Sequence, residues 1–165
     1  MDITIKLVFW AGLLLILKHF LADGPFQTDY QYKNKGKWLH PGGLLHAGIH
    51  GVGTLLAVFL AFVIVSVAKP LWYITCFSIL IALADFTVHY LIDLIKIKTT
   101  ENFGWTELTD TGTGQNKKKC LVINSNKYFW AFMADQAAHF LTYIIIICVM
   151  LAVYLQTPGI YLDKI

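Results

Sequence analysis

Four long apolar runs constrain the fold of this 165-residue chain more than any other feature of its sequence. A helix needs about 20 mainly apolar residues to cross the hydrocarbon core of a bilayer, which is roughly 30 Å thick. The runs cover approximately residues 3–22, 44–68, 71–95 and 128–155. The sequence therefore predicts an all-α, polytopic membrane protein, in which residues 1–165 form a single domain built as a bundle of four transmembrane helices.

The composition supports a membrane class. Hydrophobic residues make up 57% of the chain and charged residues 14%, whereas a soluble domain is about 45–50% apolar and about 25% charged. The first run lacks a small-residue cleavage motif, so we expect a membrane helix there rather than a signal peptide. The expected partner is the lipid bilayer, and the absence of nucleic-acid motifs argues against a nucleic-acid partner.

The connections between the runs contain residues that end or begin helices. Gly24 and Pro25 follow the first run, Pro41 precedes the second, and Pro70 separates the second from the third. Residues 99–127 are rich in polar residues, and a loop of this length is usually functional or mobile. We therefore expect a long polar loop between the third and fourth helices.

Lysine distribution predicts the orientation of the chain. Nine lysines lie in the two large loops and three at the opposite side, namely Lys6, Lys69 and Lys164. Positively charged loops favour the cytoplasmic side of a membrane. This contrast predicts that both large loops are cytoplasmic and that both termini lie outside.

Ionisable residues occur in every predicted helix at a common spacing of four residues. That spacing places two side chains on one helix face, one turn apart. The pairs lie late in helices one and three and early in helices two and four, so all of them fall in one half of the membrane, on the side of the large loops. The residues are His19, Asp23, His46, His50, Asp85, His89, Asp93, Asp135 and His139.

Burial of charge in lipid makes these nine residues candidate metal ligands. An ionised aspartate at the centre of a membrane helix costs roughly 2.5–3.5 kcal/mol, so it pairs, binds a ligand or lines water. A mixture of imidazole and carboxylate ligands favours Zn, Mn or Fe over Ca or Mg. We predict one or two divalent ions, with Asp93 also suited to orienting a histidine ligand. Purely structural Asp–His hydrogen bonds are the alternative for any single pair.

Three polar residues near these pairs are candidates for substrate binding. Gln27 and Asp29 follow the first predicted helix, and Gln136 is adjacent to Asp135. A polar stretch at this position can cover the opening of an intramembrane site or bind a head group. A solvated loop is the alternative interpretation for Gln27 and Asp29.

Several of these motifs resemble a known family. They are residues 19–29 (HFLADGPFQTD), 45–51 (LHAGIHG), 89–93 (HYLID) and 135–139 (DQAAH). Together they resemble the membrane family catalogued as domain of unknown function 3307, which occurs in bacteria and phages. The resemblance covers most of the chain except residues 99–127 and the C-terminal end. It implies four membrane helices in a bacterial inner membrane and a common site for these residues, but it implies no activity.

Three functions remain open from the sequence. The first is a metal-dependent hydrolase acting at the cytoplasmic side on a lipid head group, a lipid-linked phosphate or a small polar substrate, with Asp85 or Asp23 as general base. The second is transport of a metal ion or proton, as a homo-oligomer. The third is a non-enzymatic phage or bacterial membrane protein that binds a host partner and contains a structural metal site.

Overall fold

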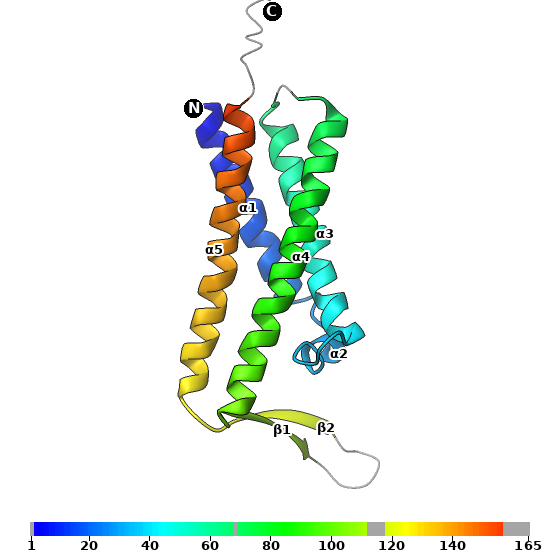
Figure 1. Cartoon of the computed structure of the whole chain (residues 1–165), viewed down its shortest axis with the longest axis vertical. Coiled ribbons are helices and arrows are strands. Elements are labelled where there is room, and N and C mark those ends of the chain that lie inside the picture. Colours follow the sequence, from blue (N-terminus) through cyan, green and yellow to red (C-terminus); the bar gives the residue numbers. More distant parts are fainter. Residues whose placement is uncertain (1, 68, 112–117, 157–165) are drawn as a thin grey trace, which may run out of the picture.

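The computed structural model describes residues 2–67, 69–111 and 118–156 (Figure 1). The long helices are α1 (Ile3–Asp23), α3 (Pro41–Ile64), α4 (Leu71–Asn102) and α5 (Lys127–Leu155), and the short elements are helix α2 (Asp29–Tyr32) and strands β1 (Thr106–Thr111) and β2 (Lys118–Ile123). All four long helices are long and apolar enough to cross a membrane. The predicted class, an all-α bundle with four membrane-length helices, is confirmed.

The four long helices form a ring. Helix α1 packs on α3, α3 on α4, α4 on α5, and α5 back on α1. The first residues of α1, the last residues of α5 and the α3–α4 connection lie at one end of the bundle (Figure 1). Helix α2 and the two strands lie at the other end, so the molecule has one end with short connections and one end with large connections.

Helix α3 begins at Pro41, earlier than the predicted residue 44. The side chain of His40 caps the helix by accepting a hydrogen bond from the Gly42 backbone N–H (3.1 Å). Proline at the first helical position already has the φ angle that a helix needs. The helix ends at Ile64, and Ser66 has a positive φ of 54°. The predicted end at residue 68 lies outside the described residues.

The connection between α4 and α5, for which the sequence predicts a polar loop over residues 99–127, contains a pair of strands in its described parts. Helix α4 continues to Asn102 and stops before Gly104, whose φ of +64° suits glycine. Strands β1 and β2 then pair antiparallel, from Thr106 opposite Ile123 to Thr111 opposite Lys118. Threonines and the run from Leu121 to Ile123 favour strands. Residues 112–117, in the centre of the predicted loop, lie outside the described residues.

The interior of the bundle changes character along its length. In the half with short connections it is apolar, and Leu7, Leu15, Val58, Phe62 and Met150 are each at most 2% exposed. In the half near α2 the buried side chains are largely histidine, aspartate and lysine. Large apolar side chains on the outer surface, such as Leu80 and Leu83 on α4, are exposed, as expected for surfaces that face lipid.

Helices α3 and α4 approach closely at Gly51. A Cβ at this position would lie 3.2 Å from both the carbonyl oxygen of Ala82 and the Cβ of Phe86. Glycine therefore permits a helix separation that a larger residue would prevent. Because His50 precedes Gly51, the close approach also brings the His50 ring onto the ring of His89.

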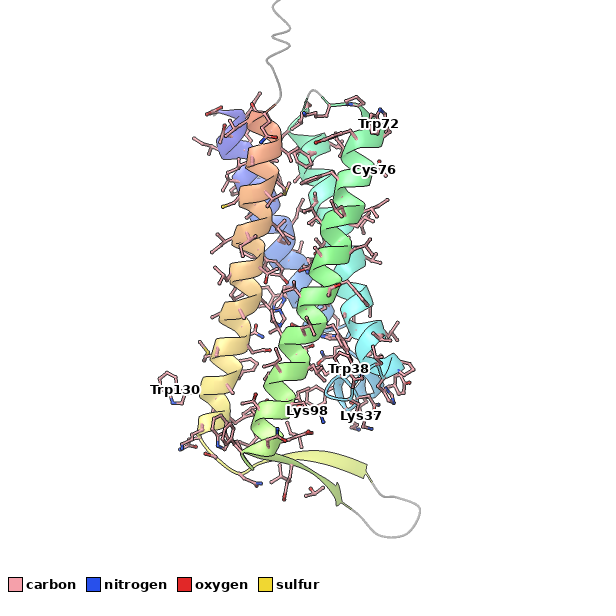
Figure 2. All side chains as sticks on the ribbon, in the orientation of Figure 1. Lys37, Trp38, Trp72, Cys76, Lys98 and Trp130 are labelled. Atoms are coloured by element: carbon pink, nitrogen blue, oxygen red, sulfur yellow. The ribbon has the colours of Figure 1, made fainter. Side chains whose placement is uncertain are left out.

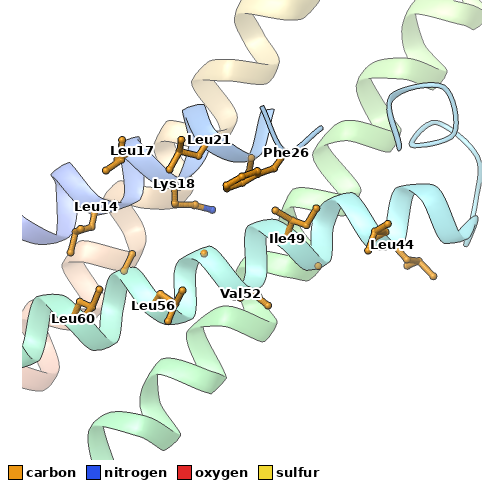
Figure 3. A pocket seen from close by; sticks show the side chains of 15 residues that line it. Leu14, Leu17, Lys18, Leu21, Phe26, Leu44, Ile49, Val52, Leu56 and Leu60 are labelled. Atoms are coloured by element: carbon orange, nitrogen blue, oxygen red, sulfur yellow. The ribbon is translucent and has the colours of Figure 1, made fainter. Parts of the chain in front are cut away.

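An apolar groove of about 620 Å³ lies between helices α1 and α3 (Figure 3). Its walls include Leu14 and Leu17 on α1 and Val52 and Leu56 on α3. A Cβ at Gly48, which also lines the groove, would meet nothing within 4 Å. The groove opens on the apolar outer surface of the bundle and runs beside the buried polar half.

Candidate metal centre

Five of the six histidines converge inside the polar half of the bundle. The rings of His50 and His89 stack with their centres 3.5 Å apart, and those of His89 and His139 stack at 4.1 Å. His46 lies 4.8 Å from His50, and His19 lies 5.3 Å from His139. The rings come from all four long helices, at the common depth expected from the sequence.

The first candidate group of ligands consists of Asp23, His46, His50 and His89. Each residue offers one ligand atom within 4.8 Å of the other three. Nε2 of His46 and Nε2 of His50 lie 3.1 Å and 3.4 Å from Oδ1 of Asp23. In a tetrahedral site with bonds of 2.0–2.1 Å, the ligand atoms are about 3.3–3.4 Å apart. The two distances to Asp23 are close to this spacing, and the four residues of the first group could hold a metal ion.

The second candidate group consists of His89, Asp93 and His139. Oδ2 of Asp93 lies 3.6 Å from Nε2 of His89 and 3.2 Å from Nε2 of His46, so this oxygen stands between the two groups. His89 belongs to both groups, and one imidazole nitrogen binds one ion. The two groups are therefore overlapping positions, which share a histidine and are joined by a carboxylate.

Several buried polar atoms in this region have no hydrogen-bond partner among the described residues. They are Nδ1 and Nε2 of His50, Nδ1 and Nε2 of His89, Oδ2 of Asp93 and Oδ1 of Asp135. Leaving a buried polar group unsatisfied costs roughly 1–3 kcal/mol, and more when the group is charged. Nitrogen and carboxylate atoms that face one another without hydrogen-bond geometry fit the inside of a metal coordination shell.

His19 lies outside both groups, although the sequence predicts it as a ligand. Its Nε2 is 3.2 Å from Oδ2 of Asp23 and 3.1 Å from Oε1 of Gln136. Its Nδ1 is 2.9 Å from the hydroxyl of Tyr143. With the proton on Nε2, His19 donates to Oε1 of Gln136 and accepts from the Tyr143 hydroxyl, and its ring lies behind the carboxylate of Asp23. This arrangement orients the carboxylate of Asp23, a role that commonly tunes metal affinity.

Asp85 also lies outside both groups, although the sequence predicts it as a ligand and general base. Its Oδ2 accepts from Nζ of Lys18 at 2.8 Å and from the Thr54 hydroxyl at 2.7 Å. Lys18 and Asp85 are both buried. In Figure 3 the Lys18 side chain extends from α1 toward α3. An aspartate held by a lysine and a hydroxyl stabilises the bundle and is a poor metal ligand.

Two more lysines offset carboxylates of the cluster. Nζ of Lys35 lies 3.2 Å from Oδ1 of Asp93, and Nζ of Lys96 lies 3.3 Å from Oδ2 of Asp135. Among the described residues, Asp23 is then the carboxylate of the cluster without a lysine partner. If the histidines are neutral, the ionised groups in and around the cluster carry one net negative charge. They are four carboxylates and three ammonium groups, namely Asp23, Asp85, Asp93, Asp135, Lys18, Lys35 and Lys96. This balance suits one divalent ion better than two, because a second ion would leave a large uncompensated positive charge.

The three predicted substrate-binding residues lie in different surroundings. Nε2 of Gln27 is 3.4 Å from Oδ1 of Asp23 and 3.2 Å from Nε2 of His46, so Gln27 covers the first group. Gln136 contacts His19 and donates to Oδ2 of Asp135 at 3.2 Å. Asp29 is on the surface of α2 and pairs with Lys33 at 2.9 Å, away from the cluster.

Sequence reasoning missed the partners Lys18, Lys35, Lys96 and Tyr143. Lys18 was detectable, because a lysine inside an apolar run requires a buried partner. Tyr143 was detectable as well, because it continues the spacing of Asp135 and His139 by one further turn. Lys35 and Lys96 contributed only to the count of loop charges, and nothing in their local sequence indicates that they turn inward.

These features define the class of protein: a bundle of four membrane-length helices with a buried cluster of histidine and aspartate that could hold a metal ion. The chain belongs to the family described as protein of unknown function (DUF3307), whose model matches residues 12–161. The match includes every residue of the cluster and confirms the resemblance seen in the sequence. No curated protein and no solved structure matches the chain.

Proposed function

We propose that this protein is an integral protein of a bacterial inner membrane that binds one divalent ion, Zn, Mn or Fe, and hydrolyses an ester at the cytoplasmic side. The substrate would be a lipid head group, a lipid-linked phosphate or a small polar ester. The main support is the set of buried imidazole and carboxylate atoms without hydrogen-bond partners among the described residues. The net charge of the cluster favours one ion, held by the first group.

The side chains have distinct roles in this proposal. The four residues of the first group, Asp23, His46, His50 and His89, would hold the ion, and a bound divalent ion would supply an acidified water and a Lewis acid for a phosphoryl or carbonyl oxygen. Asp135 has one oxygen fixed by Lys96 and Gln136, while Oδ1 is buried and without a hydrogen-bond partner among the described residues. We assign Asp135 as the general base in place of Asp85.

The hydrolytic step is an ordinary ester cleavage. Asp135 accepts a proton from the attacking water, whose oxygen forms a new bond to phosphorus or to the acyl carbon. The bond to the leaving oxygen breaks, and that oxygen takes up a proton. His139, whose Nε2 is 3.7 Å from Oδ1 of Asp135, lies where it can pass the proton on.

Transport has less support from the arrangement of the bundle. A path for ions needs polar groups across the whole membrane. In the described residues of the half with short connections, the core consists of apolar side chains such as Leu7, Leu15 and Met150. A structural metal site in a protein that binds a partner is the other alternative. It differs from the proposal because protein ligands would fill every coordination position of the ion, and no substrate would be hydrolysed.

Metal content is the first test of the proposal. We expect purified protein to contain about one equivalent of Zn, Mn or Fe, and His50→Ala and His89→Ala to lose most of it. His40→Ala is the matched control, because His40 is the sixth histidine, caps α3 and lies outside the cluster. Metal-free wild-type protein, or equal metal in His50→Ala and wild type, would refute the metal centre.

Catalysis is tested separately with Asp135→Asn. This variant keeps a side chain of the same shape, so we expect it to retain the ion and to lose at least 100-fold in hydrolysis of phosphate and carboxylic esters. Full activity in Asp135→Asn would refute the assigned base. A metal-loaded wild-type protein that hydrolyses no ester in such a panel would instead support the structural site.

A further inference from the structure

A second cavity, of about 180 Å³, lies at the end of the bundle that carries α2 and the strands. It is bordered by the segment after α2, the last turns of α4, both strands and the start of α5. Figure 2 shows Lys37 and Lys98 at this end of the molecule. The lining contains one acidic residue, Glu101, and five lysines: Lys33, Lys35, Lys37, Lys96 and Lys98.

Two of these lysines join the cavity to the metal centre. Lys35 and Lys96 line the cavity, and their Nζ atoms lie 3.2 Å from Asp93 and 3.3 Å from Asp135. Asp93 belongs to the second group, and Asp135 is the proposed base. An anion bound in the cavity would therefore be one side chain away from the cluster.

We infer that this cavity binds the phosphate group of a phosphate ester and is the entrance through which that ester reaches the metal centre. The inference rests on the proposed function and names its substrate class. Lysine ammonium groups are point charges that bind phosphate oxygens strongly, and a concave basic surface concentrates anions. A volume of about 180 Å³ is enough for a phosphate group, with the rest of the ester outside the cavity.

The charges of the cavity remain able to bind an anion. Lys37 donates to the neutral Oδ1 of Asn34 at 2.7 Å. Lys98 pairs with Glu101 at 3.5 Å, and such partly exposed pairs are weak enough for a dianionic phosphate to replace them.

The test removes the three lysines that do not contact the cluster. The variant Lys33→Gln/Lys37→Gln/Lys98→Gln and the control Lys6→Gln/Lys69→Gln, which removes charge at the opposite end, are placed in phosphatidylcholine nanodiscs. One arm titrates glycerol phosphate by calorimetry. The other arm adds phosphatidic acid to the nanodiscs and measures the lipid retained by native mass spectrometry. Each arm uses protein as purified and protein stripped of metal by a chelator.

We expect wild type and control to bind a phosphate monoester in at least one arm, with or without metal, and the triple variant to bind roughly tenfold or more weakly. Binding of glycerol phosphate would identify a soluble ester, and binding of phosphatidic acid alone would identify a lipid head group. No binding in either arm, or equal binding by the triple variant, would overturn the inference. Metal content measured on the same samples shows independently whether the proposed metal centre fails.

Discussion

At the scale of single residues, the ligand atoms of the cluster fall into two kinds. Some face other candidate ligands, and others contact supporting side chains around the cluster. Asp23 faces His46 and His50 with Oδ1, while its Oδ2 contacts His19. Asp93 faces His46 with Oδ2, while its Oδ1 is held by Lys35. Each carboxylate thus directs one oxygen at the histidines and the other at a supporting side chain. This arrangement is expected of metal-binding carboxylates, which are usually oriented by further contacts.

Removal of one hydroxyl tests this supporting layer. We predict that Tyr143→Phe weakens metal binding by roughly 10–100-fold, because His19 loses the contact that fixes its ring behind Asp23. Tyr154→Phe is the matched control, since it removes a hydroxyl near the other end of α5. Metal affinity is measured by competition with a chelator. Equal affinities in the two variants would show that His19 does not position Asp23.

The Lys18–Asp85 pair tests the structural role assigned to Asp85. Removing one partner of a buried ion pair usually costs about 3–5 kcal/mol, because the remaining charge is left uncompensated. We predict this loss for Lys18→Met in the free energy of unfolding in mixed micelles. The double variant Lys18→Met/Asp85→Asn should recover more than half of it. A double variant as unstable as the sum of both single changes would show that the two side chains do not interact.

At the scale of helices and strands, the sequence predicted the spans and the depth of the cluster but not its internal contacts. The repeated spacing of Asp135 and His139, and of His46 and His50, is enough to put those side chains on one face. The contact of Lys18 with Asp85 joins residues 67 positions apart, and it depends on how α1 leans across α3 and α4. Local patterns carry no information on that angle.

The paired strands were missed for a related reason. Strands are recognised from the sequence by one apolar face and one polar face, whereas β1, with the sequence TELTDT, contains a single apolar residue. Helix α4 also ends later than predicted, because its last turns are polar. The run of apolar residues indicates the segment of α4 that can lie in lipid, and the helix continues beyond that segment.

Two glycines on α3 test how helix spacing builds the centre. We predict that Gly51→Leu destabilises the protein by roughly 1–3 kcal/mol, since its side chain must push apart α3 and α4 at Ala82 and Phe86. It should also lower metal content by separating His50 from His89. Gly48→Leu places the same side chain in the open groove and should lower neither the free energy of unfolding nor the metal content. Similar effects of both substitutions would contradict this account.

At the scale of the whole molecule, the two ends of the bundle differ in their connections, in their number of lysines and in the character of the core between the helices. One end has short connections over an apolar core, and the other has lysines, the strands and the buried cluster. We propose that the second end faces the cytoplasm, because lysine-rich loops favour that side. Trp72 at one end and Trp38 and Trp130 at the other are strongly exposed, as expected for side chains in the two interfacial regions (Figure 2).

Cysteine labelling tests this orientation. Trp72→Cys and Trp38→Cys suit the experiment in a background without other cysteines, because the two tryptophans are similarly exposed, at 68% and 65%. In intact cells, we predict that a membrane-impermeant maleimide labels Trp72→Cys and not Trp38→Cys. Both should react after the cells are lysed. Labelling of Trp38→Cys alone in intact cells would invert the proposed topology.

The length of α4 has a mechanical consequence. Its 32 residues extend about 48 Å, whereas the hydrocarbon layer is roughly 30 Å thick. In a membrane, the final turns of α4 would extend beyond the hydrocarbon layer and hold the paired strands away from the lipid surface. If the bilayer thins or swells, the height of the strands above it changes, while the spacing between the imidazoles, fixed by neighbouring helices, stays the same.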